Sequence, residues 1–291
     1  MGHPKPTKHG VPGFYEDAKH FGQEIATAFA GVLDLRKVLA AYEHEPPGTN
    51  KPARDLTDQE AFDLLIHLVY RGELMLDEKI RTDAAGKIIY PTPGKQMRVR
   101  ARMSGIEYTH ATNPKIHHFT AKPALAIALY RMAQKLNGGY YGVTEIVWGG
   151  AIGYGHEGKR ANCHEIGTCI DIYKASMRFG TFDVYKDWGL RPVHKPDGTV
   201  VQGDHGDPWA DATKTYYRLR EKEDGVKYYF FIELYRAGVE QFTIGPTDNL
   251  DLEEGKPVKE GANIFHPDYP AMGLRRSHQE HMHFQIGPSY L

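Results

Sequence analysis

The stretch HQEHMHFQIG, from His278 to Gly287, places three histidines in six residues directly before an apolar run. A short apolar run with aromatic and β-branched residues is typical of a β-strand. Successive side chains of a strand point to opposite faces, so His281 and His283 are expected to share a face. Two imidazoles on one face can bind one metal ion together, or one can bind it while the other transfers protons. The H-x-H pattern is weak evidence by itself, because the chain has 16 histidines.

A second polar segment, NCHEIGTCIDIY at 162–173, predicts a turn that leads into a strand. His164 and Asp171 lie seven positions apart, so a continuous strand would place them on opposite faces. Gly167 permits a bend that brings both side chains to one point. With a histidine from the last strand they make two nitrogen ligands and one oxygen ligand. Three protein ligands and one open position are typical of catalytic zinc, whereas structural zinc is commonly closed by four.

Two other interpretations of this segment are weaker. The run HEIGT carries Thr168 where the helical zinc motif H-E-x-x-H requires its second histidine. Cys163 and Cys169 could be soft ligands beside His164, but two cysteines cannot make a four-cysteine zinc site. Their spacing of six residues allows a local disulfide. We expect instead two reduced, partly buried thiols.

The two segments together resemble a known group of zinc proteins. The pattern H-x-x-G-x-x-x-D, followed far downstream by H-x-H, resembles the lysostaphin, D-Ala-D-Ala metallopeptidase and hedgehog fold group. The ending HQEHMH, which has the form H-x-x-H-x-H, is similar to that of the penicillin-insensitive murein endopeptidases. Those zinc enzymes cut peptide cross-links in peptidoglycan. The resemblance covers roughly residues 120–173 and 277–291.

The resemblance implies a role for each residue of these motifs. His164, Asp171 and His283 would bind one Zn²⁺ ion, and His281 would be the active-site histidine beside it. His278 would lie at the rim of the site, in contact with substrate or with the bound water. The implied activity is hydrolysis of peptide bonds in peptidoglycan stem peptides or cross-links.

Two further residues test the resemblance. Some relatives place a catalytic glutamate three residues before the last zinc ligand, which is the position of Glu280. Strand alternation places Glu280 on the face opposite His281, so we favour His281 as the acid–base group and keep Glu280 as the alternative. D-Ala-D-Ala peptidases often carry a Ser-Gly-Tyr-Arg run whose arginine holds the substrate. Here only Arg160 could substitute for it, which favours an endopeptidase over a carboxypeptidase.

The composition limits the class of partner and the route to the substrate. Of 291 residues, 41% are hydrophobic and 25% charged, as in globular proteins, and the net charge of −1 gives no bulk attraction to nucleic acid. No apolar run approaches the roughly 20 residues of a membrane span. The N-terminus lacks the apolar core of a signal peptide. A wall-cleaving enzyme acts outside the cytoplasm, in the periplasm or cell wall, so we expect an unidentified export or lysis route. Nothing in the sequence indicates an oligomeric state.

The expected fold is α+β, with a small antiparallel sheet, packed helices, one zinc site and additional N-terminal helices. Helices are predicted at 17–44, 56–74 and 121–139, the last capped by Thr120, and strands at 96–103, 143–153 and the two motifs. The segment 226–238 could be helix or strand.

These elements suggest two parts. The first is an N-terminal helical region at 1–115 with a packing, targeting or inhibitory role. The second is a metallopeptidase domain at 116–291 with an insertion at 181–277.

Two alternatives to an enzyme remain at this stage. The same fold could be a zinc-stabilised binding module without catalytic activity, in which a fourth protein ligand closes the metal site. The chain could also be a structural or interaction protein of a phage or secretion apparatus, with the N-terminal helices as its docking part.

Overall fold

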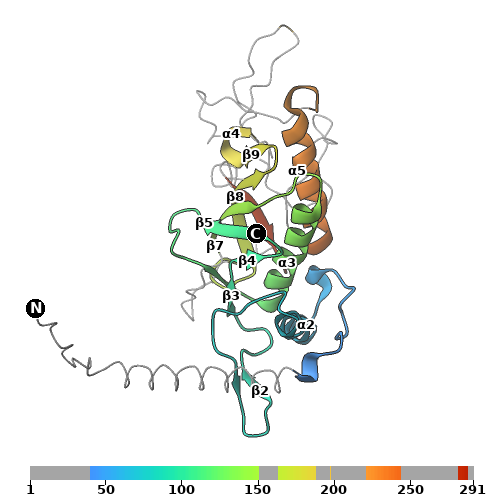
Figure 1. The fold of residues 1–291 in the computed structure, drawn as a ribbon, viewed down its shortest axis with the longest axis vertical. Helices are drawn as coiled ribbons and strands as arrows, with labels where there is room; N and C mark the ends of the chain where they lie inside the picture. Colours follow the sequence, from blue (N-terminus) through green and yellow to red (C-terminus); the bar gives the residue numbers. More distant parts are fainter. Residues whose placement is uncertain (1–39, 151–162, 188–196, 198–220, 244–280, 288–291) are drawn as a thin grey trace, which may run out of the picture.

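The computed structural model describes residues 40–150, 163–187, 197, 221–243 and 281–287 (Figure 1). The predicted helix at 17–44 therefore lies almost wholly outside the described residues, which begin with a 3-10 turn, η1 (Ala40–Tyr42). Helices and small, mostly antiparallel sheets make up the described part, so the mixed α+β class is confirmed.

Helix α2 (Asp58–Tyr70) lies within the helix predicted at 56–74 and begins at a capping box of Thr57 and Glu60. Thr57 Oγ1 accepts a hydrogen bond from the Glu60 backbone N–H at 3.2 Å, and Glu60 Oε2 accepts one from the Thr57 N–H at 3.0 Å. These bonds satisfy backbone donors that the helix start leaves without a helical partner. A 3-10 turn, η2 (Ala53–Asp55), precedes the helix.

Two pairs of short antiparallel strands form sheets of their own: β1 (Arg81–Thr82) with β2 (Ile88–Tyr90), and β3 (Met97–Arg100) with β6 (His118–Ala121). Thr120 lies within β6, opposite Arg98, so its predicted role as a helix cap is wrong. The cap position belongs to Lys122, two residues later, because Pro123 is the first helical residue.

The main sheet has six strands in the order β10-β8-β7-β5-β4, with β9 also paired to β8. Its members are β4 (Arg102–Met103), β5 (Ile106–His110), β7 (Glu145–Gly150), β8 (Cys169–Met177), β9 (Gly180–Asp183) and β10 (Met282–Gln285). The strand predicted at 96–103 is two strands of different sheets, β3 and β4. The strand predicted at 143–153 is present as β7, and residues 151–153 lie outside the described residues. The strands predicted in the two histidine motifs are present as β8 and β10.

One pair in this sheet, β5 with β7, is parallel, and all its other pairs are antiparallel. Parallel neighbours need a long crossover, which here contains β6 and α3 (Pro123–Gly138). The pairing also crosses the predicted division at residue 115, because β5 precedes that position and β7 follows it. Residues 102–110 thus belong to the same sheet as the histidine motifs, and not to a helical region.

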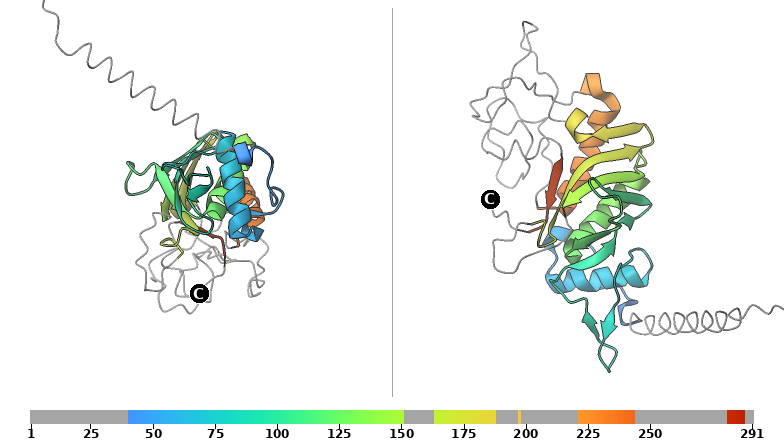
Figure 2. Two further views of the ribbon diagram at one scale, coloured as in Figure 1. Left: turned by 90° about the horizontal axis from the view of Figure 1, so that it is seen from below. Right: turned by 90° about the vertical axis from the view of Figure 1, so that its left-hand side faces the viewer.

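Helix α3 lies between two other helices, α2 and α5 (Glu221–Gln241), and packs on both. Figure 1 shows α3 and α5 side by side next to the sheet, and Figure 2 shows the helices gathered on one side of it. A four-residue helix, α4 (Val184–Asp187), follows β9. The ambiguous segment at 226–238 is helical and lies within α5. Its buried residues recur at helical spacing: Phe230, Phe231, Leu234 and Ala237.

Strand β10 separates the core from the site. The Phe284 ring packs against the Phe242 ring, with 5.1 Å between centroids, and a Cβ on Gly238 of α5 would lie 2.7 Å from Phe284 Cε1. Phe284 therefore faces the helices. Its neighbour His283 faces the other way, since alternate side chains of a strand point to opposite faces.

Candidate metal centre

The site is built on the register of two antiparallel strands. His283 of β10 is the direct partner of Asp171 of β8, and Gln285 is the partner of Cys169. Directly opposed residues of an antiparallel pair share a face of the sheet. The polar side chains of both strands therefore lie on the face opposite Phe284, which confirms the predicted alternation of the H-x-H motif.

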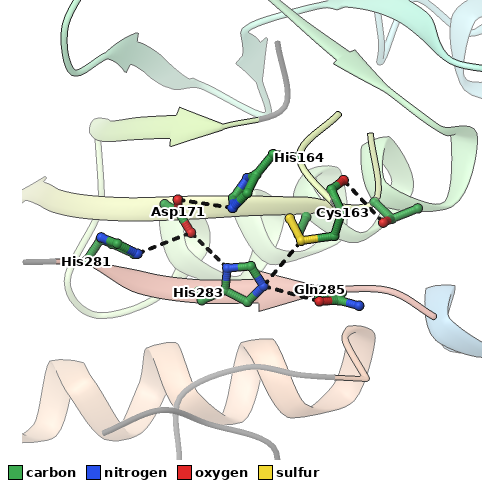
Figure 3. Close-up of a disulfide and its surroundings, with 8 residues drawn as sticks. Cys163, His164, Asp171, His281, His283 and Gln285 are labelled. Carbon is green, nitrogen blue, oxygen red and sulfur yellow. Dashed lines mark hydrogen bonds and ion pairs between the residues drawn. A yellow bond between two sulfur atoms is a disulfide. The ribbon is translucent and has the colours of Figure 1, made fainter. Parts of the chain in front are cut away.

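The Asp171 carboxylate is the point on which three histidines converge (Figure 3). Its Oδ1 atom lies 2.9 Å from His283 Nδ1 and 3.6 Å from His281 Nε2. Its Oδ2 atom lies 3.4 Å from His164 Nε2. The structure thus brings together four of the seven residues that the sequence nominates. The other three, Arg160, His278 and Glu280, lie outside the described residues.

His164 reaches this point from a tight turn before β8. Gly167 has a φ of +69°, a conformation that favours glycine, and the turn is closed by the Thr168 N–H, which donates to the Cys163 carbonyl at 2.9 Å. The Lys122 N–H donates to the Gly167 carbonyl at 2.8 Å, so the start of α3 holds the turn in place. The bend predicted at Gly167 is confirmed.

Gly150, at the end of β7, makes room for the His164 ring. A Cβ on Gly150 would lie 2.0 Å from His164 Nδ1, and the φ of this glycine is +73°. Gly149 leaves similar room for Tyr173, whose ring lies 5.3 Å from that of His281. Sequence reasoning did not connect these two glycines or Tyr173 with the site.

Buried charge organises the site. Asp171 and His283 are 8% and 7% exposed, and His281 is 9% exposed, so water screens their interactions weakly. Burial raises the pKa of Asp171, but the hydrogen bond with His283 and the charges of the three histidines outweigh it. The pKa of this carboxyl is therefore below its ordinary value, which favours the carboxylate form that binds metal ions.

The donor types of this cluster fit a metal ion. A tetrahedral zinc bound at about 2.0–2.2 Å by nitrogen and oxygen ligands places neighbouring ligand atoms about 3.3–3.6 Å apart. His164 Nε2 lies 3.4 Å from Asp171 Oδ2 and His283 Nδ1 lies 2.9 Å from Asp171 Oδ1, so the two histidines approach different oxygens of the carboxylate. Two imidazoles and a carboxylate are ligand types of catalytic zinc, and it is this donor set that fits a metal ion.

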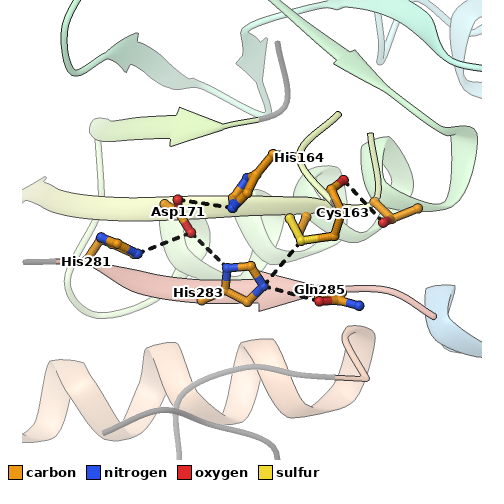
Figure 4. Close-up of polar contacts among 8 residues, drawn as sticks. Cys163, His164, Asp171, His281, His283 and Gln285 are labelled. Carbon is orange, nitrogen blue, oxygen red and sulfur yellow. Dashed lines mark hydrogen bonds and ion pairs between the residues drawn. A yellow bond between two sulfur atoms is a disulfide. The ribbon is translucent and has the colours of Figure 1, made fainter. Parts of the chain in front are cut away.

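Gln285 is a member of the site that sequence reasoning missed. Its Oε1 atom lies 3.3 Å from His283 Nε2, on the side of the ring away from Asp171 (Figure 4). When the imidazole proton is on Nε2, Gln285 Oε1 can accept it, and the lone pair of Nδ1 is then available to a metal ion beside Asp171. When the proton is on Nδ1, it is donated to Asp171 Oδ1 at 2.9 Å. The alternation of the last strand, extended by two residues, could have identified Gln285.

The two cysteines form a disulfide beside the histidines. The sulfur atoms of Cys163 and Cys169 lie 2.14 Å apart, with 5.3 Å between the Cα atoms. The expectation of two reduced thiols is therefore wrong. The six-residue spacing permits the bridge because the turn at Gly167 folds the chain back between them. The four residues Cys163, His164, Cys169 and His283 could also hold a metal ion, since one ligand atom from each lies within 4.8 Å of the others.

No family model, curated protein or solved structure matches this chain. Among the described residues, no helix combines the length and apolar character that a bilayer crossing requires.

Proposed function

We propose that the protein is a zinc-dependent peptidoglycan endopeptidase, which hydrolyses peptide bonds in stem peptides or cross-links. The observation that carries the proposal is the convergence of His164, His281 and His283 on the Asp171 carboxylate. The sequence resemblance supplies the substrate class. Apart from Arg160, the sequence offers no counterpart of the arginine with which D-Ala-D-Ala peptidases hold their substrate. Cleavage of a terminal D-Ala is therefore the less favoured activity.

In this proposal some residues of the site bind the metal ion and another transfers protons. His164, Asp171 and His283 hold one Zn²⁺, and His281 lies next to them with its Nε2 atom 3.6 Å from Asp171 Oδ1. When bound, zinc lowers the pKa of a coordinated water to about 7 and polarises the scissile carbonyl. His281 accepts the proton of the attacking water and delivers it to the leaving amine. Glu280 is the alternative acid–base group, and Arg160 and His278 contribute to substrate binding.

The disulfide supports action outside the cytoplasm. Structural disulfides persist in oxidising compartments such as the periplasm and the extracellular space. Cys163–Cys169 lies beside the site, so the disulfide is expected in the protein that meets its substrate. The periplasm or cell wall is therefore the proposed place of action.

Digestion of purified sacculi tests this function. Zinc-loaded protein should convert cross-linked muropeptide dimers to monomers, detected by mass analysis, and a carboxypeptidase would instead shorten stem peptides by one alanine. His164→Ala and His283→Ala should lose both zinc and hydrolysis. His118→Ala is the matched control, because His118 lies on β6 and pairs with Asp77 at 3.4 Å. Full hydrolysis in either ligand variant would refute the proposal.

A second candidate function is favoured by the Cys163, His164, Cys169 and His283 group. Four protein ligands would close the metal and make the domain a zinc-stabilised binding module, because a closed site has no position for water. Elemental analysis combined with a thiol count separates the two. A zinc-loaded protein that keeps its disulfide cannot use the cysteine sulfurs as thiolate ligands.

A further inference from the structure

His283 lies between two different sets of metal-binding atoms. Its Nδ1 atom faces Asp171 Oδ1 at 2.9 Å, and its Nε2 atom faces Cys163 Sγ at 3.7 Å. Figure 3 shows the ring placed between the carboxylate and the sulfur. A neutral imidazole has one lone pair, on whichever nitrogen lacks the proton, so it can bind a metal ion on only one of these sides at a time.

The sulfur side has the composition of a closed zinc site. In a tetrahedral site with zinc–sulfur distances of about 2.3 Å, a sulfur and a nitrogen ligand lie about 3.6 Å apart. The 3.7 Å between Cys163 Sγ and His283 Nε2 is close to this value. His164 and Cys169 complete the set within 4.8 Å. In the disulfide form neither sulfur is a thiolate, so only the carboxylate side can bind zinc.

We propose that reduction of the Cys163–Cys169 disulfide creates a second zinc site, with two cysteine and two histidine ligands, that excludes the first. Both sites use His164 and His283. The first site adds Asp171 and an open position, whereas the second adds the thiolates of Cys163 and Cys169. The proposal rests on the proposed function in treating the carboxylate side as the active form. The reduced protein is therefore an inactive, closed form, and oxidation of the cysteines releases the open one.

Each arrangement leaves His283 with a suitable partner for its remaining proton. When Nδ1 binds the metal, the proton is on Nε2, which donates to Gln285 Oε1 at 3.3 Å. When Nε2 binds the metal, the proton is on Nδ1, which donates to Asp171 Oδ1 at 2.9 Å. Metal-binding histidines almost always donate their second N–H in this way. Asp171 thus changes from ligand to hydrogen-bond acceptor.

The chemistry balances with a cellular dithiol as reductant. The sulfur–sulfur bond takes up two electrons and two protons from the dithiol, which becomes a disulfide. Zinc then displaces the two thiol protons of Cys163 and Cys169. In the reducing cytoplasm this keeps a wall-cleaving enzyme closed, and in an oxidising compartment the bridge forms again.

Cobalt spectroscopy of the metal-free full-length protein tests the second site without relying on activity. Protein reduced with a trialkylphosphine should bind one equivalent of Co²⁺ and show the near-ultraviolet thiolate-to-cobalt charge-transfer band. Oxidised protein should bind one equivalent without this band. Absence of the band in reduced protein overturns the proposal, and so does binding of two equivalents, because the sites would then not exclude each other.

Two variants assign the ligands. Asp171→Ala should keep the charge-transfer band after reduction and lose Co²⁺ binding when oxidised. A Cys163→Ser and Cys169→Ser double variant should lack the band under both conditions. The comparison of reduced with oxidised wild-type protein uses no variant. A folding defect in either variant therefore does not affect that comparison.

Muropeptide release separates this inference from the proposed function. Zinc-loaded oxidised protein should hydrolyse sacculi, and reduction should abolish the activity. If the band appears on reduction but oxidised protein is inactive, the proposed function fails and the second site stands. If oxidised protein is active and the band never appears, the second site alone fails.

Discussion

His283 and Asp171 are direct partners on neighbouring strands, and His283 Nδ1 lies 2.9 Å from Asp171 Oδ1 inside the protein. A slip of one residue in this register would turn His283 into the core and Phe284 toward the site, because side chains alternate along a strand. The packing of Phe284 on Phe242 therefore also fixes the histidine. The apolar face of β10 specifies the geometry of its polar face.

Asp171→Asn should lower zinc affinity more than the 10–100-fold typical of residues that only orient a ligand. The change keeps the shape of the side chain and removes the charge on which three histidines converge. Competition with a chromogenic chelator measures the affinity. Asp183→Asn is the matched control, since Asp183 is equally buried at 8% but pairs with Lys174 at 2.8 Å. Equal losses in both variants would contradict a specific role for Asp171.

Gly150→Ala, at the end of strand β7 beside the site, should disrupt zinc binding. The new Cβ would lie 2.0 Å from His164 Nδ1 and must displace the ring. Gly86→Ala is the control, because Gly86 also has a positive φ, +81°, but open space around it. Both variants should lose about 1 kcal/mol of stability from the left-handed backbone. Only Gly150→Ala should lose zinc, and retention of zinc would show that His164 is not a ligand.

Local patterns predicted much of this architecture. Alternation placed His281 and His283 on one face, and the bend at Gly167 brought His164 to Asp171. Both depend on a few neighbouring residues. Likewise the helix predicted at 56–74 is present as α2, and its capping box is a motif within one turn of helix.

The errors concern relationships between distant or folded segments. The parallel pairing of β5 with β7 depends on a crossover through α3, which no local pattern encodes. The disulfide depends on how tightly the turn at Gly167 closes, and spacing alone leaves that undecided. The segment at 226–238 was ambiguous because a continuous aromatic run has no clear period. Packing against α3, and the close approach of Gly238 to Phe284 of β10, select the helix.

Gln285→Leu should weaken zinc binding by about 10–100-fold while the fold is kept, because Gln285 Oε1 orients His283 through its Nε2 proton. Gln285→Glu should restore binding, since a carboxylate oxygen accepts the same proton. Chelator competition on oxidised protein measures both. An unchanged affinity in the leucine variant would show that His283 needs no such acceptor.

Glu60 should make the stability of α2 depend on pH. Hydrogen bonds with Lys51 and the Thr57 backbone lower the pKa of Glu60 from 4.5 to about 2. A lowered pKa in the folded state stabilises the fold above the unfolded-state pKa, and the effect is lost as pH falls from 4.5 to about 2. Glu60→Gln should therefore lower the denaturation midpoint at pH 7 and lose this effect near pH 2. Glu107→Gln is the control, because Glu107 is an exposed residue of β5, and an equal pH dependence there would contradict the assignment.

His281→Ala should separate proton transfer from metal binding. His281 Nε2 lies 3.6 Å from Asp171 Oδ1, on the same face as His283, so it can exchange a proton beside the ion without holding it. We expect hydrolysis of sacculi to fall by about 10²–10⁴-fold, the usual contribution of an acid–base group. Zinc content should stay at one equivalent, whereas His283→Ala should lose the ion itself. Glu280→Ala should keep most of the activity. If Glu280→Ala instead abolishes hydrolysis and His281→Ala does not, the acid–base role belongs to Glu280.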